Sequence, residues 1–181
     1  MITTLFDKLK IIYNGGMVKR YHNRPVLHAQ NNAEHQYMVA SIACLLYPKI
    51  PVQLLKNILW HDIYEYETGD MPWAIKRQNP DIKAAIMRIE KQSIERYELT
   101  TKLSTLEHSI LKLAEYFECM IFCINELKLG NSEYDQSFWD CCEQIDILNL
   151  YMKKNKQEVY KKSQYILESL LMEKENVRAR C

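Results

Sequence analysis

The sequence has few residues that break helices: of 181 residues, four are glycine and five are proline. These two types make up about 12% of an average protein, so their scarcity disfavours a turn-rich β sandwich and favours long helices. No run approaches the roughly 18 uninterrupted apolar residues of a membrane-spanning helix. The chain also lacks an excess of one charge, since 24 Lys and Arg stand against 23 Asp and Glu. This balance argues against bulk electrostatic binding to nucleic acid or to an anionic membrane.

The sequence begins without the pattern of a secretory signal, because Asp7 comes too early after Met1. We therefore expect a cytoplasmic protein, in the host cytoplasm if it is viral. The six cysteines are then expected to be reduced and packed in the interior. Cys119 and Cys123 are spaced for one helix face, but no second cysteine pair at ligand spacing completes a metal site.

Apolar residues recur with a helical period along almost the whole chain, which predicts an all-α fold. A chain of this length is enough for one core, so we predict a single domain over 1–181. Capping residues, glycines and prolines set the predicted boundaries. The expected helices follow Thr3 or Thr4 as far as Gly15-Gly16, then cover 32–46, 51–67, 72–78, 80–98, 105–129, 135–153 and 155–175, with an irregular crossing segment over 17–30.

A histidine, a His-Asp pair and nearby carboxylates carry the chemical signal. His35 lies on the predicted helix 32–46, and His61 and Asp62 are adjacent on the next helix. Glu65 follows His61 by four residues, so we expect it on the same side of that helix. Imidazole and carboxylate groups suit a divalent transition metal, which polarises phosphoryl oxygens and acidifies a bound water. Each residue alone also fits a packed or solvated side chain, so the prediction depends on their combination.

The order of these motifs resembles that of the HD-domain metal phosphohydrolases. The chain is similar to their small bacterial 5′-deoxynucleotidases, and equally to the phage relatives that include dATP triphosphohydrolases. The resemblance covers about residues 5–130 and implies an HD-domain helical bundle, with helices over 131–175 that pack on this core or form an oligomer interface. The motifs that carry it are Arg20-Tyr21, Asn31-x-Ala33-Glu34-His35, His61-Asp62-x-x-Glu65 and Thr68-Gly69-Asp70-Met71-Pro72.

By motif position, the resemblance implies that His35, His61 and Asp62 are metal ligands. The fourth ligand of the family is an aspartate in a Lys-x-Ala-Asp context, where this chain has Lys112-Leu113-Ala114-Glu115. Glu115 is longer than aspartate by one methylene, so it can bind the metal only if its backbone lies further back. The implied cofactor is a divalent transition metal, with Co, Mn or Zn favoured and Mg also open.

The resemblance also implies two catalytic carboxylates. Glu65 would orient or deprotonate the attacking water. Asp70 matches an acid of the family that lies near the water and the sugar. The residues around Asp70, Thr68-Gly69-Asp70, also fit a plain helix stop with an Asx turn.

Five further residues are expected to bind substrate. Arg20 would hold phosphate oxygens, because a guanidinium makes bidentate contacts. Tyr21 stands where the family often has a tryptophan facing the sugar, so its ring would press on the 2′ carbon. Asn23 would lie near the base, while Lys76 and Arg77 would reach the outer phosphates of a triphosphate or else form a solvated basic turn.

The activity implied by the resemblance is metal-dependent hydrolysis of the 5′ phosphoester of 2′-deoxynucleotides. The phage-type likeness favours dATP as substrate, cleaved to deoxyadenosine and triphosphate. One alternative is a 5′-deoxynucleotidase that acts on deoxynucleoside monophosphates, and another is a non-catalytic helical module with a structural metal. We expect a small nucleotide as partner, no nucleic acid or membrane, and a homo-oligomer of two or more chains.

Overall fold

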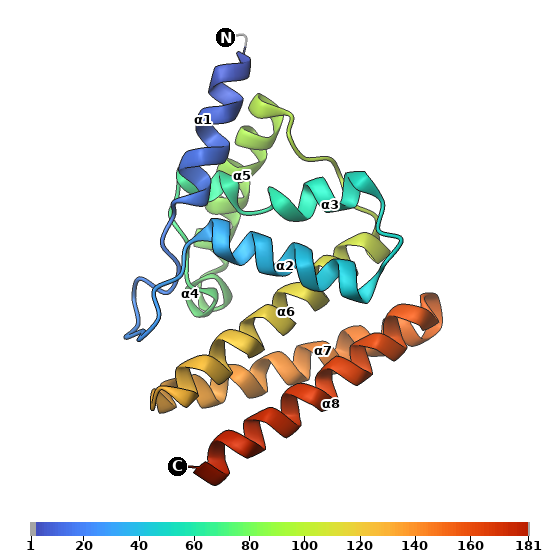
Figure 1. Ribbon diagram of the computed structural model, residues 1–181. Helices are drawn as coiled ribbons and strands as arrows, with labels where there is room; N and C mark the ends of the chain where they lie inside the picture. The colour runs from blue at the N-terminus through green and yellow to red at the C-terminus, as the bar shows by residue number, and fades with distance from the viewer. Residues whose placement is uncertain (1–2, 181) are drawn as a thin grey trace. The chain divides into compact units, whose positions relative to one another are not determined.

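The structure, a computed structural model, describes residues 3–180 and is helical almost throughout (Figure 1). These residues contain no strand, and Lys19 and Asn31 form their one isolated antiparallel bridge. The predicted all-α class is confirmed, and no described helix is long and apolar enough to cross a membrane. The elements are α1 (Leu5–Gly16), α2 (Asn32–Leu46), α3 (Val52–Leu59), η1 (Ile63–Tyr66, a 3-10 turn), α4 (Trp73–Gln78), α5 (Pro80–Tyr97), α6 (Thr105–Lys128), η2 (Ser132–Tyr134, also 3-10), α7 (Asp135–Asn155) and α8 (Gln157–Arg180).

Reciprocal caps begin two of these helices where the sequence predicted them. At α1, the Thr4 hydroxyl accepts from the Asp7 backbone N–H, and the Asp7 carboxylate accepts from the Thr4 backbone N–H. At α6, Ser104 and Glu107 make the same exchange. Each exchange satisfies backbone donors that a helix leaves unpaired at its start, which fixes the position of the first turn.

The predicted third helix is wrong in its second half. α3 ends at Leu59, and a turn precedes η1. The His61 Nδ1–H donates to the Ile58 carbonyl oxygen at 2.7 Å, which is the acceptor that the Asp62 N–H would use in a continued α-helix. A side chain thus competes with the helical hydrogen bonds, and His61 and Asp62 lie in a turn rather than on a helix.

Residue contacts group the chain into two compact units. The first contains the residues up to Tyr37 together with Lys56–Lys102, and the second contains Met38–Leu55 together with the residues from Leu103 onward. The division falls within α2 and within α3. The single domain stays a prediction, and each unit is described by itself.

The core of the first unit packs α1 against the 3-10 turn η1. Ile11 of α1 is buried with Ile63 and Tyr64 of η1, and Trp60 packs against them. Gly15 of α1 makes the closest approach, because a Cβ added there would lie 2.6 Å from the Ile63 Cα. Only a glycine therefore lets the two backbones meet, and this contact fixes the segment that follows the His-Asp pair.

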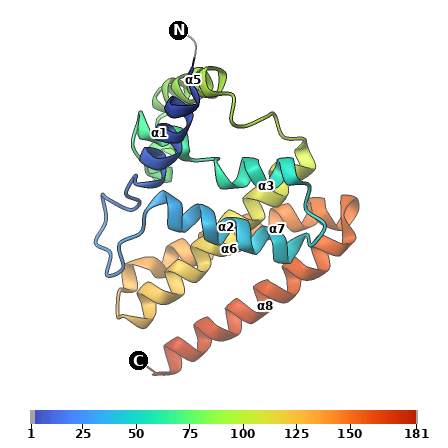
Figure 2. The same ribbon diagram turned by 45° about the horizontal axis from the view of Figure 1, so that its top comes forward.

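The second unit is built around three long helices. α6, α7 and α8 pack on one another and lie side by side in both views (Figures 1 and 2; yellow, orange and red). Lys174 of α8 is buried, with Nζ 2.8 Å from an oxygen of Asp135 at the start of α7. Arg178 donates to the same carboxylate, so α8 continues to Arg180 rather than ending near residue 175 as predicted.

The described cysteines carry free thiols. Cys123, Cys141 and Cys142 are buried, as the sequence predicted, whereas Cys44 is exposed and the prediction of interior packing is wrong there. Cys44 lies on α2 in the second unit, on a solvent-facing side of that helix. Cys181 lies outside the described residues.

Candidate active site

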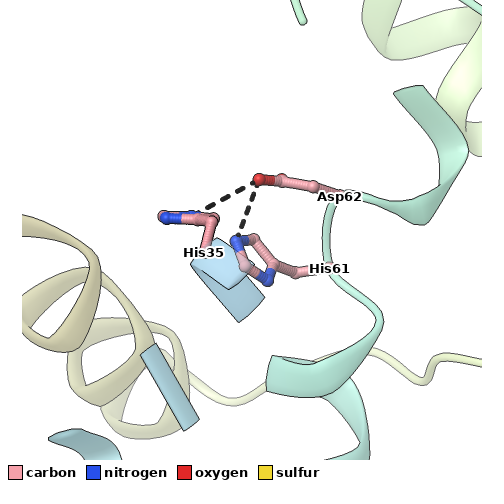
Figure 3. A group of neighbouring side chains, drawn as sticks. All are labelled: His35, His61 and Asp62. Carbon is pink, nitrogen blue, oxygen red and sulfur yellow. Dashed lines mark ion pairs between the residues drawn. The ribbon is translucent and has the colours of Figure 1, made fainter. Parts of the chain in front are cut away.

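Three side chains from two segments of the first unit converge on one point (Figure 3). His35 comes from α2, and His61 and Asp62 come from the turn after α3. One ligand atom of each lies within 4.8 Å of the others. Asp62 Oδ2 is 3.1 Å from His61 Nε2 and 3.6 Å from His35 Nε2. The structure thus brings together three of the four predicted metal ligands.

The hydrogen bonding of His61 suits a bound cation. The Ile58 carbonyl can only accept, so His61 Nδ1 carries the proton and Nε2 presents a lone pair. That lone pair faces Asp62 Oδ2 at 3.1 Å, and two acceptors this close repel unless a proton or a cation lies between them. Imidazole nitrogens with a carboxylate oxygen are donors typical of zinc and related divalent ions. These three residues therefore fit a divalent metal.

Asp62 is held in its ionised form. Burial by itself would raise the pKa of Asp62. When a proton occupies His61 Nε2 in place of a metal, the charge and hydrogen bond of His61, followed by the charges of His35 and Arg20, hold that pKa well below its usual value. A carboxylate must be ionised to bind a metal, so its surroundings prepare Asp62 for this role.

Arg20 lies beside the cluster, with Nη1 3.2 Å from Asp62 Oδ2. It belongs to the crossing segment between α1 and α2, which is irregular, as predicted. The Arg20 N–H donates to the Gln30 carbonyl at 2.9 Å, and the Asn32 N–H donates to the Val18 carbonyl at 3.0 Å. These bonds fix the backbone of the segment that carries Arg20, and the contact with Asp62 holds its guanidinium next to the ligand group.

Glu65 is buried in η1, close to the cluster. Burial, and then the negative charges of Asp62 and Asp70, raise the pKa of Glu65 to about 8. Asn32 Nδ2 donates to Glu65 Oε2 at 3.0 Å, and this hydrogen bond lowers the pKa of Glu65. Sequence reasoning missed Asn32 as a site residue, although its position three residues before His35 places both on one helix face.

Asp70 holds the backbone of Tyr21. The Tyr21 N–H donates to Asp70 Oδ2 at 3.3 Å, and Tyr21 has a φ of 55°, in the left-handed region. A non-glycine residue rarely adopts this conformation without support. The Arg20 guanidinium lies 5.6 Å from the centre of the Tyr21 ring, so one loop presents both residues beside the cluster.

Four predicted site residues are not part of this group. Glu115 lies on α6 in the second unit, where Lys112 Nζ forms an ion pair with it. Asn23 is exposed in the crossing segment, and Lys76 and Arg77 occupy the last turn of α4. Metal binding by Glu115 and substrate binding by the other three stay predictions.

Comparison with known proteins agrees with this geometry. Over residues 8–163 the chain matches the family described as YfbR-like 5′-deoxynucleotidase. It is 26% identical over 151 residues to a 5′-deoxynucleotidase of Vibrio atlanticus (strain LGP32), which covers 67% of this chain and 75% of the relative. The identity is 25% over 145 residues to the 5′-deoxynucleotidase of Vibrio cholerae serotype O1, with the same shares covered.

The fold is similar to that of the Cyanophage S-2L HD phosphohydrolase DatZ, which was solved bound to dA and one catalytic Zn²⁺ ion. The TM-score is 0.71 at 21% sequence identity, and the match covers 95% of this chain and 99% of that one. This likeness confirms the predicted HD-type helical fold. Because the family match spans most of the chain, the protein belongs to the YfbR-like 5′-deoxynucleotidase family.

Proposed function

We propose that this enzyme hydrolyses the 5′ phosphoester of 2′-deoxynucleoside monophosphates, using one divalent metal held by His35, His61 and Asp62. The observation that carries the proposal is the convergence of these three side chains within 4.8 Å, in a chain of the 5′-deoxynucleotidase family. The products are a deoxynucleoside and orthophosphate. Glu115 is proposed as the fourth ligand on the basis of its motif position alone.

A divalent cation bound at this group supplies neutralising charge for the phosphate and lowers the pKa of a coordinated water. A cation held by His35, His61 and Asp62 would also offset the two negative charges that raise the pKa of Glu65. Zn²⁺, Mn²⁺ and Co²⁺ suit the donor atoms, and the phage HD phosphohydrolase of the same fold holds Zn²⁺.

The protein side chains divide the remaining work. Arg20 binds phosphate oxygens of the substrate, and Glu65 orients the attacking water and accepts its proton. The water oxygen bonds to phosphorus, the P–O5′ bond breaks, and the deoxynucleoside leaves as its 5′ alcohol after taking up a proton. Asp70 fixes the loop so that the Tyr21 ring presses on the 2′ carbon of the sugar, which disfavours a ribonucleotide.

A second candidate substrate is dATP, cleaved to deoxyadenosine and triphosphate. The observation that favours it is the dA bound to the phage HD phosphohydrolase, which shares the fold over 95% of this chain. In this reading, Lys76 and Arg77 contact the outer phosphates and Asn23 contacts the base. We also propose that the enzyme is cytoplasmic and forms a homo-oligomer. Light scattering after size exclusion measures the molar mass and so tests whether the chain is an oligomer.

A substrate panel tests the proposed function. Each deoxynucleoside mono- and triphosphate, with its ribo counterpart, is incubated with Mn²⁺, Co²⁺, Zn²⁺ or Mg²⁺, and the products are separated by chromatography. The proposal predicts deoxynucleoside and orthophosphate from the deoxy monophosphates, with slower turnover of the ribo forms. Intact triphosphate released from dATP alone establishes the second candidate. No turnover of any deoxynucleotide by metal-loaded protein contradicts both and points to a structural metal.

A further inference from the structure

We propose that Asn32 is a positioning residue, which holds the Glu65 carboxylate in the orientation needed to align the attacking water. This inference rests on the proposed function and deepens it. Asn32 Nδ2 donates to Glu65 Oε2 at 3.0 Å and to the Asp62 backbone carbonyl at 3.2 Å. One amide group thus ties α2 to both chemically important residues that follow α3.

The orientation of this amide follows from the chemistry of its partners. A backbone carbonyl oxygen accepts hydrogen bonds and cannot donate, and the carboxylate oxygen of Glu65 is the second acceptor. The NH₂ group of Asn32 must therefore face both atoms, and each of its two protons has a partner. Both protons are committed, so rotation of the amide would break two hydrogen bonds at once.

Asn32 is itself held firmly. Its side chain is fully buried, and it occupies the first turn of α2, three residues before His35. Its backbone N–H donates to the Val18 carbonyl at 3.0 Å. Just before it, Asn31 and Glu34 exchange side-chain to backbone hydrogen bonds that fix the start of the helix. A donor mounted on such a rigid element defines the position of the group that accepts from it.

Glu65 has little else to direct its carboxylate. Among the side chains that the structure describes, Asn32 is the one for which a hydrogen bond to the Glu65 carboxylate is seen. The neighbouring carboxylates of Asp62 and Asp70 repel it, and the charge of Arg20 attracts it more weakly than the Asn32 hydrogen bond does. Without the Asn32 amide, these two charges would turn the Glu65 side chain away from them. The Asn32 side chain donates to no ligand atom of His35, His61 or Asp62, but it does hold the Asp62 backbone carbonyl, so bound metal is measured together with turnover.

The test compares Asn32→Ala and Asn32→Asp with Asn31→Ala as the matched control. Asn32→Asp keeps the size of the side chain but removes the donor. It therefore shows whether a loss of kcat in Asn32→Ala comes from the missing hydrogen bond or only from the cavity that alanine leaves. We expect both Asn32 variants to lower kcat by about 10- to 100-fold, with KM and bound metal per chain close to wild type. Asn31→Ala removes a helix cap beside the site but keeps the Asn32 amide, so it should lower the melting temperature while it reduces kcat far less than either Asn32 variant.

A double-mutant cycle with Glu65→Gln separates positioning from a structural role. If Asn32 acts through Glu65, then Asn32→Ala should reduce kcat far less in the Glu65→Gln background than in wild type. A wild-type kcat in both Asn32 variants, a fully additive loss, or a loss explained by missing metal overturns the inference. An inactive wild type over the whole substrate panel overturns the proposed function itself, whereas an active wild type with unaffected Asn32 variants overturns only the role of Asn32.

Discussion

Lys174 of the second unit and Glu65 of the first are both buried, but their charged neighbours are of opposite kinds. In the second unit, the Lys174 ammonium is buried 2.8 Å from a carboxylate oxygen of Asp135, and the hydrogen bond from Lys174 is the main cause that lowers the pKa of Asp135. In the first unit, Glu65 is buried near Asp62 and Asp70, two groups of its own sign. Burial and these charges raise the pKa of Glu65 to about 8.

The pairing of Lys174 suits a group that stabilises the fold, whereas the crowding around Glu65 suits the proposed chemistry. An opposite charge offsets the desolvation of a buried ion, as Asp135 does for Lys174. Acids gathered in one place destabilise the fold until a cation or a proton joins them, and such strained groups cluster at functional sites. Metal binding at the first unit should therefore stabilise the protein as well as activate it.

The largest expected effect is on turnover, from Glu65→Gln. This change keeps the shape and an acceptor for Asn32 but removes proton transfer, so kcat should fall by about 100-fold or more. Bound metal should be unchanged, and the melting temperature should stay level or rise because one of the crowded acids is neutralised. Exposed Glu95 of α5 gives the matched control, and Glu95→Gln should keep wild-type kcat. A Glu65→Gln enzyme within twofold of wild type would contradict its assigned role.

The next effect is on stability, from Asp135→Asn in the second unit. This change leaves the Lys174 ammonium buried without its carboxylate, and we expect a loss of about 2 kcal/mol in urea unfolding. That is below the usual 3–5 kcal/mol for a broken buried pair, because Asp135 is itself 37% exposed. Lys174→Met should cost less, since an apolar chain can pack against the Phe138 and Trp139 rings that now face the ammonium. If Lys174→Met instead lowered the stability more than Asp135→Asn, the Asp135 carboxylate would not be what offsets the buried Lys174 charge.

A smaller loss of stability is expected from Gly15→Ala in the first unit. The added methyl would lie 2.6 Å from the Ile63 Cα, so the α1 and η1 backbones must separate, at about 1–2 kcal/mol. At the neighbouring Gly16, an added Cβ meets the Ala33 Cβ at 3.2 Å, which a small shift relieves. In thermal unfolding, Gly15→Ala should therefore have a clearly lower melting temperature than Gly16→Ala. Equal melting temperatures would contradict the close approach of the Gly15 and Ile63 backbones.

The smallest effect is a pH dependence in the second unit. The pKa of Asp135 is lower in the folded chain than its ordinary value, so the unfolded chain binds its proton first as the pH falls. The stabilisation is complete above the unfolded pKa of about 4 and is lost as the pH drops through the folded pKa. The stability difference between wild type and Asp135→Asn should shrink below about pH 4. A difference that grows on acidification would reverse the sign of this linkage.

The sequence predicted the regular parts of the fold well. α6, α7 and α8 have strong helical periodicity and clear start signals, such as the Ser104–Glu107 exchange. α2 was also placed correctly, because Asn31 and Glu34 mark its start. This start places His35 on a helix. The prediction that His35 belongs to the cluster therefore needed only the local helix signal and the order of the motifs.

The parts that the sequence did not predict depend on contacts between distant segments. The helix break at His61 arises because its ring turns back to the Ile58 carbonyl. The hydrophobic periodicity of the sequence does not predict this side-chain hydrogen bond. The bond from Asn32 to Glu65 and the approach of Gly15 to Ile63 each join segments far apart in the chain. Neither contact follows from the local pattern of either segment.

We propose that deoxynucleotide hydrolysis depends on a metal bound by His35, His61 and Asp62. The most direct measurement removes metal by chelation, returns Mn²⁺ in steps, and records bound metal and deoxynucleoside release in the same samples. We expect turnover to rise in proportion to bound metal and to saturate at about one ion per chain, with both lost in His61→Ala. Full turnover by the metal-free protein, or a His61→Ala variant that binds metal and turns over normally, would contradict it.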